Sequence, residues 1–227
     1  MPLLTVGHRG LMGAEPENTL RSFRRAEKEG VDVVELDIHL SADGRLVVMH
    51  DTTVDRTTDG HGRVGDLSLA QLRRLDAGLG EGVPLFEEAM ESVSTPVQAE
   101  IKDVAAARVL AASITRHGFH DRVRVISFHD AALREIRELL PSIPIALVTG
   151  ESTRTAPERA VALGADMVSC EFPQLTPEVV GACHAAGLSV ISWTVNTPAE
   201  LERARELGLD GVVTDEPELA HAALGHR

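Results

Sequence analysis

The feature that most constrains the fold is a regular alternation of two kinds of segment over residues 97–214. Short apolar runs, rich in β-branched residues, alternate there with longer segments whose apolar residues recur at helical spacing. Such an alternation indicates a parallel sheet covered by helices. The expected strands are 97–101, 123–127, 143–148, 166–170, 188–194 and 211–214. The expected helices are 104–117, 130–140, 157–163, 177–186 and 198–207, with a last helix after the final strand.

The amino-terminal part adds two parallel strands, at 3–6 and 33–39. A helix lies between them, with Asn18 or Thr19 as its cap, Leu20, Phe23 and Ala26 as its buried stripe, and Gly30 at its end. Eight parallel strands are the number that closes a TIM barrel. The competing architecture is an open, doubly wound sheet, but no glycine-rich nucleotide loop follows the first strand. We therefore expect an α/β TIM barrel.

A β-hairpin over residues 33–51 adds an antiparallel strand to this barrel. Its first half alternates apolar and polar residues, and Asp43-Gly44 is typical of a two-residue turn. Counting back from that turn places Asp37 opposite His50, and so gathers these two residues with Glu35. The alternative is a solvated hairpin whose polar residues face water.

The segment from about residue 52 to 96 departs from the barrel rhythm. It contains a glycine-rich polar loop, a short helix with a capping box at Ser68 and Gln71, and a helix over 84–93. We expect a small cap or insertion without a core of its own. Residues 1–227 are then one barrel domain.

Charge and cysteine content limit the partners and the compartment. The formal net charge of -13 argues against nucleic acid or an anionic membrane surface as the main partner. Cys170 and Cys183 form no multi-cysteine framework, so we expect reduced thiols and neither a disulfide nor a zinc site. The amino terminus lacks the pattern of a secretion signal, and no apolar run is long enough to span a membrane. These features predict a cytoplasmic protein without stable membrane association; they leave its oligomeric state open.

Polar residues concentrate at the carboxyl ends of the expected strands, where a TIM barrel has its active site. They are His8, Arg9, Glu35, Asp37, His50, Glu100, Lys102, Ser127, Glu171, Trp193 and Asp215. Three carboxylates, from Glu35, Asp37 and Glu100, would repel one another in a partly dehydrated mouth, so a bound cation is expected. Ligation by oxygen alone favours Mg²⁺ or Ca²⁺ over zinc. Alternatively, the acids form structural ion pairs, Glu100 with Lys102 and Asp37 with Arg9.

A metal, two cations and two histidines suit phosphoryl chemistry. Arg9 and Lys102 would neutralise phosphate oxygens, while one imidazole removes a proton and the other supplies one to the leaving alkoxide. The catalytic candidates are His8 and His50, and His39 is a candidate for supporting the site. Six other histidines are interpreted as surface or packing residues: His61, His117, His120, His184, His221 and His226.

With these residues the chain resembles the glycerophosphodiester phosphodiesterase family over most of its length. The resemblance lies in the order of its motifs: Gly7-His8-Arg9-Gly10, Pro16-Glu17-Asn18-Thr19, Glu35-Leu36-Asp37, His50-Asp51, Arg56-Thr57-Thr58, Glu100-Ile101-Lys102, Trp193-Thr194-Val195-Asn196 and Thr214-Asp215-Glu216-Pro217. It implies a TIM barrel with an insertion and the hydrolysis of a glycerophosphodiester to glycerol 3-phosphate and an alcohol.

The resemblance also implies roles for individual residues. The divalent metal would be held by Glu35, Asp37 and Glu100, and His8 and His50 would be the acid-base pair. The substrate would be bound by Arg9 and Lys102 at the phosphate and by Trp193 at the glycerol. Glu17 joins this group, where it would orient His8 or help to hold the metal; otherwise it is an acid at a helix start.

The resemblance further implies attack by the substrate's own glycerol hydroxyl, with His8 favoured as base and His50 as acid. A cyclic phosphate results, and water opens it. Two other functions compete with this one. A phospholipase-like diesterase would act on lysolipids or phosphoinositides, but no aromatic cluster builds a membrane rim. A catalytically silent barrel would bind phosphodiesters as a sensor, which the presence of every expected acid, base and cation argues against.

Overall fold

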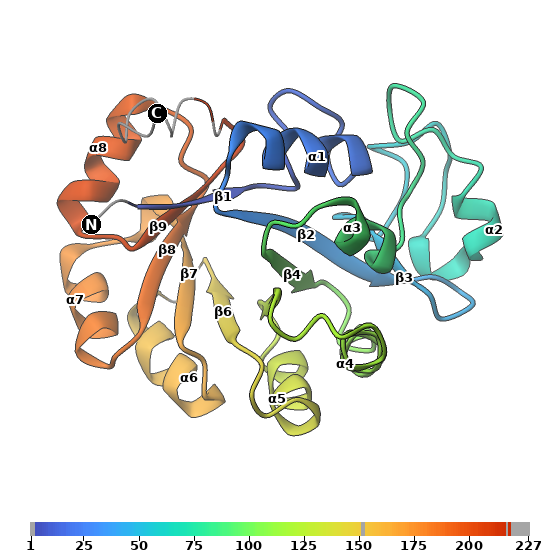
Figure 1. Ribbon diagram of the computed structural model, residues 1–227. Helices are drawn as coiled ribbons and strands as arrows, with labels where there is room; N and C mark the ends of the chain where they lie inside the picture. Colours follow the sequence, from blue (N-terminus) through green and yellow to red (C-terminus); the bar gives the residue numbers. More distant parts are fainter. Residues whose placement is uncertain (1–2, 151–152, 217, 219–227) are drawn as a thin grey trace.

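Eight parallel strands close into a barrel in the computed structural model, which describes residues 3–150, 153–216 and 218 (Figure 1). The barrel strands are β1 (Leu4–Gly7), β2 (Val33–Leu40), β4 (Val97–Ile101), β5 (Val123–Ser127), β6 (Ile145–Thr149), β7 (Met167–Glu171), β8 (Ser189–Trp193) and β9 (Gly211–Thr214). They pair in the order β1-β9-β8-β7-β6-β5-β4-β2, and β1 also pairs with β2, which closes the barrel. The predicted TIM barrel is confirmed.

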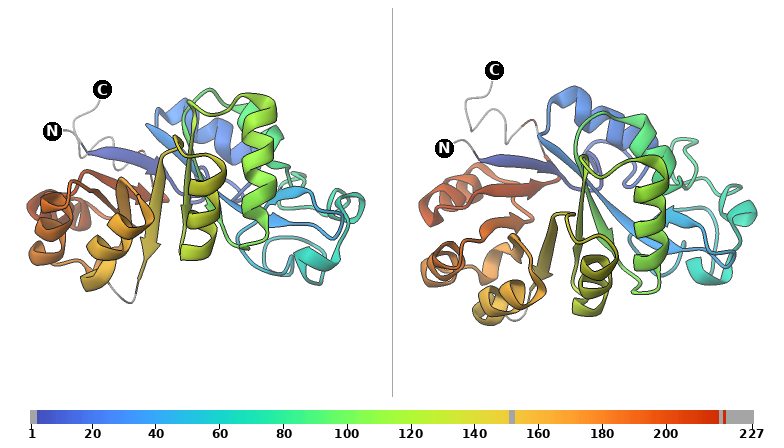
Figure 2. Two further views of the ribbon diagram at one scale, coloured as in Figure 1. Left: turned by 90° about the horizontal axis from the view of Figure 1, so that it is seen from below. Right: turned by 60° about the horizontal axis from the view of Figure 1, so that its bottom comes forward.

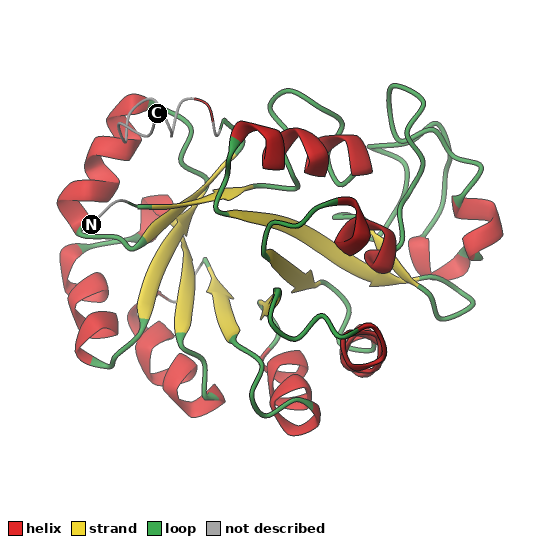
Figure 3. Cartoon of the chain, in the orientation of Figure 1, coloured by secondary structure: helices red, strands yellow, loops and turns green. Residues whose placement is uncertain are grey.

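Helices lie on the outside of the strands in every view (Figures 1, 2 and 3). They are α1 (Leu20–Glu29), α2 (Leu69–Leu72), α3 (Phe86–Ser92), α4 (Ala106–His117), α5 (Asp130–Leu139), α6 (Ala156–Leu163), α7 (Pro177–Ala185) and α8 (Pro198–Leu207). Within the described ranges, no helix combines the length and the apolar composition that crossing a bilayer requires. The helix expected after β9 falls outside the described residues, apart from position 218.

Helix α1 shows how the sequence sets these elements. The Thr19 side chain accepts a hydrogen bond from the Ser22 N–H at its start, and Gly30 ends it in the left-handed region at φ 82°. Phe23 and Ala26 are fully buried against the strands. Of the two caps that the sequence allows, the structure uses the threonine.

Side chains alternate along each strand between two apolar layers. Outward residues pack with the helices into the main core. Inward residues form a smaller cluster inside the barrel: Val6, Ile126, Ala146, Val148, Met167, Ile191 and Val213. This interior cluster is the apolar floor on which the polar residues of the strand ends stand.

The extra antiparallel strand is β3 (Leu46–Val48), but the predicted register of its hairpin is wrong by one residue. The sequence places Asp37 opposite His50, whereas Leu40 pairs with Leu46 and the Met49 N–H donates to the Asp37 carbonyl at 3.0 Å. His50 therefore lies beyond the end of β3, and a direct cross-strand pair does not bring it to Asp37.

The shift arises because the turn contains three residues, 42–44, instead of two. The Ser41 N–H donates to the Arg45 carbonyl, and Gly44 takes the left-handed conformation at φ 70°. The Ser41 hydroxyl donates to Asp43 Oδ1 and accepts from the Arg45 N–H. These side-chain bonds stabilise the longer turn.

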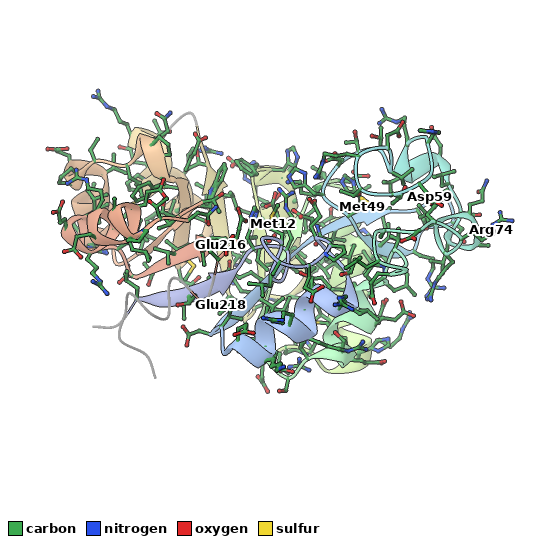
Figure 4. All side chains as sticks on the ribbon, turned by 90° about the horizontal axis from the view of Figure 1, so that it is seen from above. Met12, Met49, Asp59, Arg74, Glu216 and Glu218 are labelled. Atoms are coloured by element: carbon green, nitrogen blue, oxygen red, sulfur yellow. The ribbon has the colours of Figure 1, made fainter. Side chains whose placement is uncertain are left out.

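The insertion over residues 52–96 lies beside β3, where Met49, Asp59 and Arg74 are labelled in Figure 4, away from Glu216 after β9. It is mostly loop, with α2 and α3 (Figure 3). The expectation that it has no core of its own is wrong. With β3 it buries a separate apolar cluster: Val47, Met49, Val54, Val64, Leu72, Val83 and Leu85. Residues that β3 sends away from the barrel give the loops a surface to pack on.

Candidate active site

A cavity of about 210 Å³ opens at the carboxyl ends of the barrel strands. It is lined by His8, Arg9, Glu35, Asp37, His50, Gln98, Glu100, Lys102, Ile126, Phe128, Val148, Ser169, Trp193, Thr194 and Val213. Every residue to which the sequence assigns a catalytic, metal-binding or substrate-binding role is among them except Glu17, whereas Ser127, Glu171, Asp215 and His39 are not. The barrel therefore collects one polar cluster from segments that are far apart in the chain.

Three carboxylates line one side of the cavity. Asp37 on β2 pairs in register with Glu100 on β4, and Glu35 stands two residues earlier on the same face of β2. Each offers one oxygen atom, and these atoms lie within 4.8 Å of one another. The exposed fractions of Glu35, Asp37 and Glu100 are only 3%, 1% and 8%. Three acids in so little solvent repel one another unless protons or cations compensate for their charge.

The electrostatics of the cluster show that repulsion. Burial, with the charges of Asp37 and Glu100, raises the pKa of Glu35 well above its usual range. Burial and the charge of Asp37 raise the pKa of Glu100 to about 7. Burial also opposes ionisation of Asp37, but the charges of Lys102 and Arg9 lower its pKa overall.

Two cations border the carboxylates. The Lys102 Nζ lies 2.8 Å from Glu100 Oε1 and 3.6 Å from Asp37 Oδ1. The Arg9 Nε lies 3.4 Å from Asp37 Oδ2, and the Arg9 backbone N–H donates to Glu35 Oε2 at 2.9 Å. Both ion pairs weighed as structural alternatives are thus formed. Their cationic side chains also line the cavity, where an anionic ligand would meet them.

The cluster fits a hard divalent cation. Its donors are carboxylate oxygens, which Mg²⁺ and Ca²⁺ prefer. Glu35 Oε1 is buried, and no group in the described part of the chain donates a hydrogen bond to it. A buried acceptor without a partner is costly, and a cation would satisfy it. Glu35, Asp37 and Glu100 are therefore the residues that could hold a metal.

Each candidate histidine is oriented by an aspartate. The His8 Nδ1 lies 2.7 Å from Asp215 Oδ1, and the Asn196 side-chain amide donates to Asp215 Oδ2 at 2.7 Å. The His50 Nδ1 lies 2.7 Å from Asp51 Oδ1. With Nδ1 engaged, Nε2 is the ring atom left for a ligand in each case. Both rings line the cavity.

These aspartates and the asparagine stand inside the sequence motifs, but a motif does not show their contacts. Asp215 is 207 residues from His8, and the barrel brings them together because β9 and β1 are neighbours. Asp51 directly follows His50, so the sequence shows that the two are neighbours but does not show the hydrogen bond between their side chains. Burial lowers the pKa of His50, against the opposing effects of Asp37 and the Asp51 hydrogen bond.

Asn18 is a site residue that the sequence analysis treats as a helix cap. Its backbone takes the left-handed conformation at φ 58°. The amide donates to Asp37 Oδ2 at 2.8 Å, and its oxygen accepts from the Asp37 N–H at 3.3 Å. Asn18 therefore fixes one of the carboxylates.

Glu17 lies behind the cavity wall. Its carboxylate accepts hydrogen bonds from Arg9 Nη1 at 2.9 Å and from the guanidinium of Arg56. It contributes no atom to the carboxylate cluster. The observed contacts make it a partner of two arginines, and binding to substrate stays a prediction. His39 also lies behind the wall, where its Nε2 is 3.1 Å from the His50 carbonyl oxygen.

The opposite side of the cavity is apolar and aromatic. The Trp193 and Phe128 rings meet edge to face with centroids 5.7 Å apart. The indole N–H of Trp193 donates to the Ser169 carbonyl at 3.3 Å, which fixes the ring. The site thus joins a charged wall to an apolar wall, an arrangement suited to a ligand with an anionic group and a carbon skeleton.

Comparison with known proteins gives a consistent family. The model of the glycerophosphoryl diester phosphodiesterase family matches residues 8–219. The glycerophosphodiester phosphodiesterase of Caldanaerobacter subterraneus subsp. tengcongensis is 34% identical over 233 residues, which covers 96% of both chains. A glycerophosphodiester phosphodiesterase of Bacillus subtilis is 31% identical over 255 residues, covering 96% of this chain and 85% of the relative.

Solved structures agree with the sequence relatives. An Oleispira antarctica phosphodiesterase in complex with the product sn-glycerol-3-phosphate matches with a TM-score of 0.91 at 28% identity, covering 97% of this chain and 96% of that one. A glycerophosphodiester phosphodiesterase from Parabacteroides distasonis matches with a TM-score of 0.88 at 26% identity, covering 99% and 97%.

Proposed function

This chain belongs to the glycerophosphoryl diester phosphodiesterase family, and we propose that it hydrolyses glycerophosphodiesters to glycerol 3-phosphate and an alcohol with a divalent cation and two histidines. One observation carries the proposal. Two imidazoles, each held by an aspartate, face a cavity that also contains a buried carboxylate triad. Acid-base catalysis at phosphorus needs both a proton acceptor and a proton donor beside a centre of positive charge.

The phosphate is bound between Arg9 and Lys102 and the carboxylate cluster. A Mg²⁺ or Ca²⁺ ion held by Glu35, Asp37 and Glu100 would supply Lewis acidity and positive charge toward the phosphate oxygens. Arg9 and Lys102 stay fixed by Asp37 and Glu100, so they meet the phosphate without first being ordered.

The two histidines transfer the protons. Nε2 of one ring removes the proton from the glycerol hydroxyl that attacks phosphorus, and Nε2 of the other protonates the departing alcohol oxygen. A cyclic phosphate forms, and water opens it with the roles exchanged. Asp215 and Asp51 hold the two rings in the tautomer that this transfer needs.

The sequence assigns the base to His8 and the acid to His50, and this remains a prediction. Burial lowers the pKa of His50 in the free protein, so a proton on this ring requires help. A bound phosphate supplies it, because a nearby anion favours the charged imidazolium. A histidine that gains its proton only with substrate is suited to the acid role.

Release of glycerol 3-phosphate from a panel of glycerophosphodiesters tests the proposal. Activity should vanish with a chelator and return with Mg²⁺ or Ca²⁺. Release that persists undiminished in chelator would exclude the metal. Absence of release with any metal from the folded protein would favour a lysolipid substrate or the silent binding barrel. A cytoplasmic location, expected from the sequence, also stays a prediction.

A further inference from the structure

A second cavity of about 450 Å³ lies beside the first. Phe128, Val148 and Trp193 line both, so the two cavities adjoin each other at the aromatic pair. The other residues that line the second cavity, in the part of the chain that the structure describes, are Thr149, Gly150, Arg159 and Glu171, at the carboxyl ends of β6 and β7 and on α6. A ligand that fills the first cavity can therefore extend past Trp193 into the second.

Glu171 supplies the negative charge of this second cavity. It ends β7 in register with Trp193, which ends β8, so the carboxylate and the indole are neighbours. A Cβ placed on Gly150 would lie 3.3 Å from Glu171 Oε2, and glycine at that position leaves the carboxylate its room. No described residue forms a hydrogen bond or ion pair with the Glu171 side chain.

Arg159, the cation among the described residues of this cavity, is already engaged. Arg159 Nη2 lies 2.8 Å from Asp130 Oδ1, so its charge is largely compensated. Glu171 keeps its own charge available. The Lys102 Nζ already lies over the Phe128 ring, 5.7 Å from its centroid. The Trp193 ring and an uncompensated carboxylate together attract an organic cation, through the ring face and through Coulomb attraction.

Resting on the proposed function, we propose that the second cavity is the head-group subsite and takes a cationic amino alcohol, with Glu171 as its charge partner. Phosphate is bound in the first cavity by Arg9 and Lys102, together with the divalent cation that the three carboxylates would hold. Glycerol occupies the enclosed part of that cavity, against Trp193. The second ester substituent then crosses the aromatic pair, and an ammonium group on it comes between the Phe128 and Trp193 rings and the Glu171 carboxylate.

The test is a matched pair of substrates that differ in charge alone. One is glycerophosphocholine, and the other is its uncharged isostere, in which a carbon atom replaces the quaternary nitrogen. The wild-type protein should have a kcat/KM about fivefold higher for the choline ester, as expected for a partly exposed ion pair with an aromatic contribution. Glu171→Gln should abolish this ratio by lowering kcat/KM for the choline ester alone.

Controls separate the subsite from general effects. Glu91→Gln removes an equal charge from the exposed side of α3, outside both cavities, and should leave the ratio unchanged. Phe128→Leu removes the ring that packs edge to face against Trp193 and should reduce the ratio by a different route. If Glu171→Gln does not fold, an unchanged ratio in Phe128→Leu would still contradict the head-group subsite.

Two results would overturn the subsite. Equal kcat/KM values for the two esters in the wild-type protein would show that the second cavity does not discriminate between charged and uncharged head groups. A preference for an anionic head group that Arg159→Gln removes would assign the cavity to Arg159. Failure of the proposed function is distinct, because neither ester would then release glycerol 3-phosphate under any metal condition.

Discussion

Arg56 and Glu17 are joined by two hydrogen bonds, from Nη1 to Oε2 at 2.7 Å and from Nη2 to Oε1 at 2.8 Å. Arg56 comes from the insertion, and Glu17 precedes α1. The same guanidinium also donates to Asp51 through Nε at 2.8 Å and Nη2 at 3.0 Å. Because Asp51 orients His50 and Glu17 binds Arg9, one exposed arginine links the candidate catalytic imidazole to the candidate phosphate-binding arginine.

Arg56→Gln should lower kcat on the order of tenfold, as the loss of a group that positions site residues does. KM should change less, because Arg56 lines neither cavity. Arg56→Lys restores the charge without the planar fork and should recover only part of the rate. Steady-state kinetics of the variants, beside the exposed Arg74→Gln as control, measure the effect. A wild-type kcat in Arg56→Gln would show that the contacts of Arg56 with Glu17 and Asp51 do not contribute to turnover.

The same contacts predict acid lability. Burial opposes ionisation of Glu17, but hydrogen bonds and charges from Arg56 and Arg9 lower its pKa overall. A carboxyl group with a lowered pKa in the folded state stabilises the protein above its unfolded value, and this contribution is lost as the pH falls through the folded pKa. The loss should therefore occur below about pH 4.3, the ordinary value of a glutamate.

Urea unfolding at several pH values checks this. The free energy of unfolding of the wild-type protein should fall more steeply below about pH 4.3 than that of Glu17→Gln, which has no carboxylate to protonate. Parallel curves for the two proteins would show that the ion pairs of Glu17 contribute no net stability.

The sequence predicts the barrel better than the details of the site, and the reason is the range of the interactions. Eight strands could be predicted because each is a short apolar or alternating run bounded by turn or helix signals within a few residues. The hairpin register could not be predicted, because Asp43-Gly44 is compatible with both a two-residue and a three-residue turn. The hydrogen bonds of the Ser41 side chain favour the three-residue turn. The longer turn accounts for the one-residue difference between the predicted and the observed register at Asp37.

Contacts between distant segments were equally hidden. Asn18 carries the local pattern of a cap, and only its position beside β2 shows that its amide binds Asp37. The candidate residues themselves were predictable, since barrel geometry places every strand end at one mouth. Their hydrogen-bond partners were not.

His50→Ala should lower turnover by about 10²–10⁴, the range for loss of a general acid or base. Stability should change little, since the side chain of His50 is 32% exposed. Exogenous imidazole should restore part of the rate in the space left behind. Kinetics and thermal unfolding measure both effects, with the exposed His61→Ala as control. A variant with nearly normal turnover would remove His50 from the mechanism.

Glu35→Gln should separate metal binding from folding. Burial raises the pKa of Glu35 first, and Asp37 and Glu100 raise it further, so a neutral amide of the same shape relieves repulsion in the metal-free protein. Its oxygen can still accept from the Arg9 N–H. Metal-free Glu35→Gln should therefore unfold at the same temperature as the wild-type protein or higher. At 100 times its Kd, a divalent ion should stabilise the wild-type protein by about 2.7 kcal/mol, and the variant far less. Thermal unfolding in chelator and then in Mg²⁺ or Ca²⁺ measures this, and an equal shift in both proteins would make Glu35 a structural acid only.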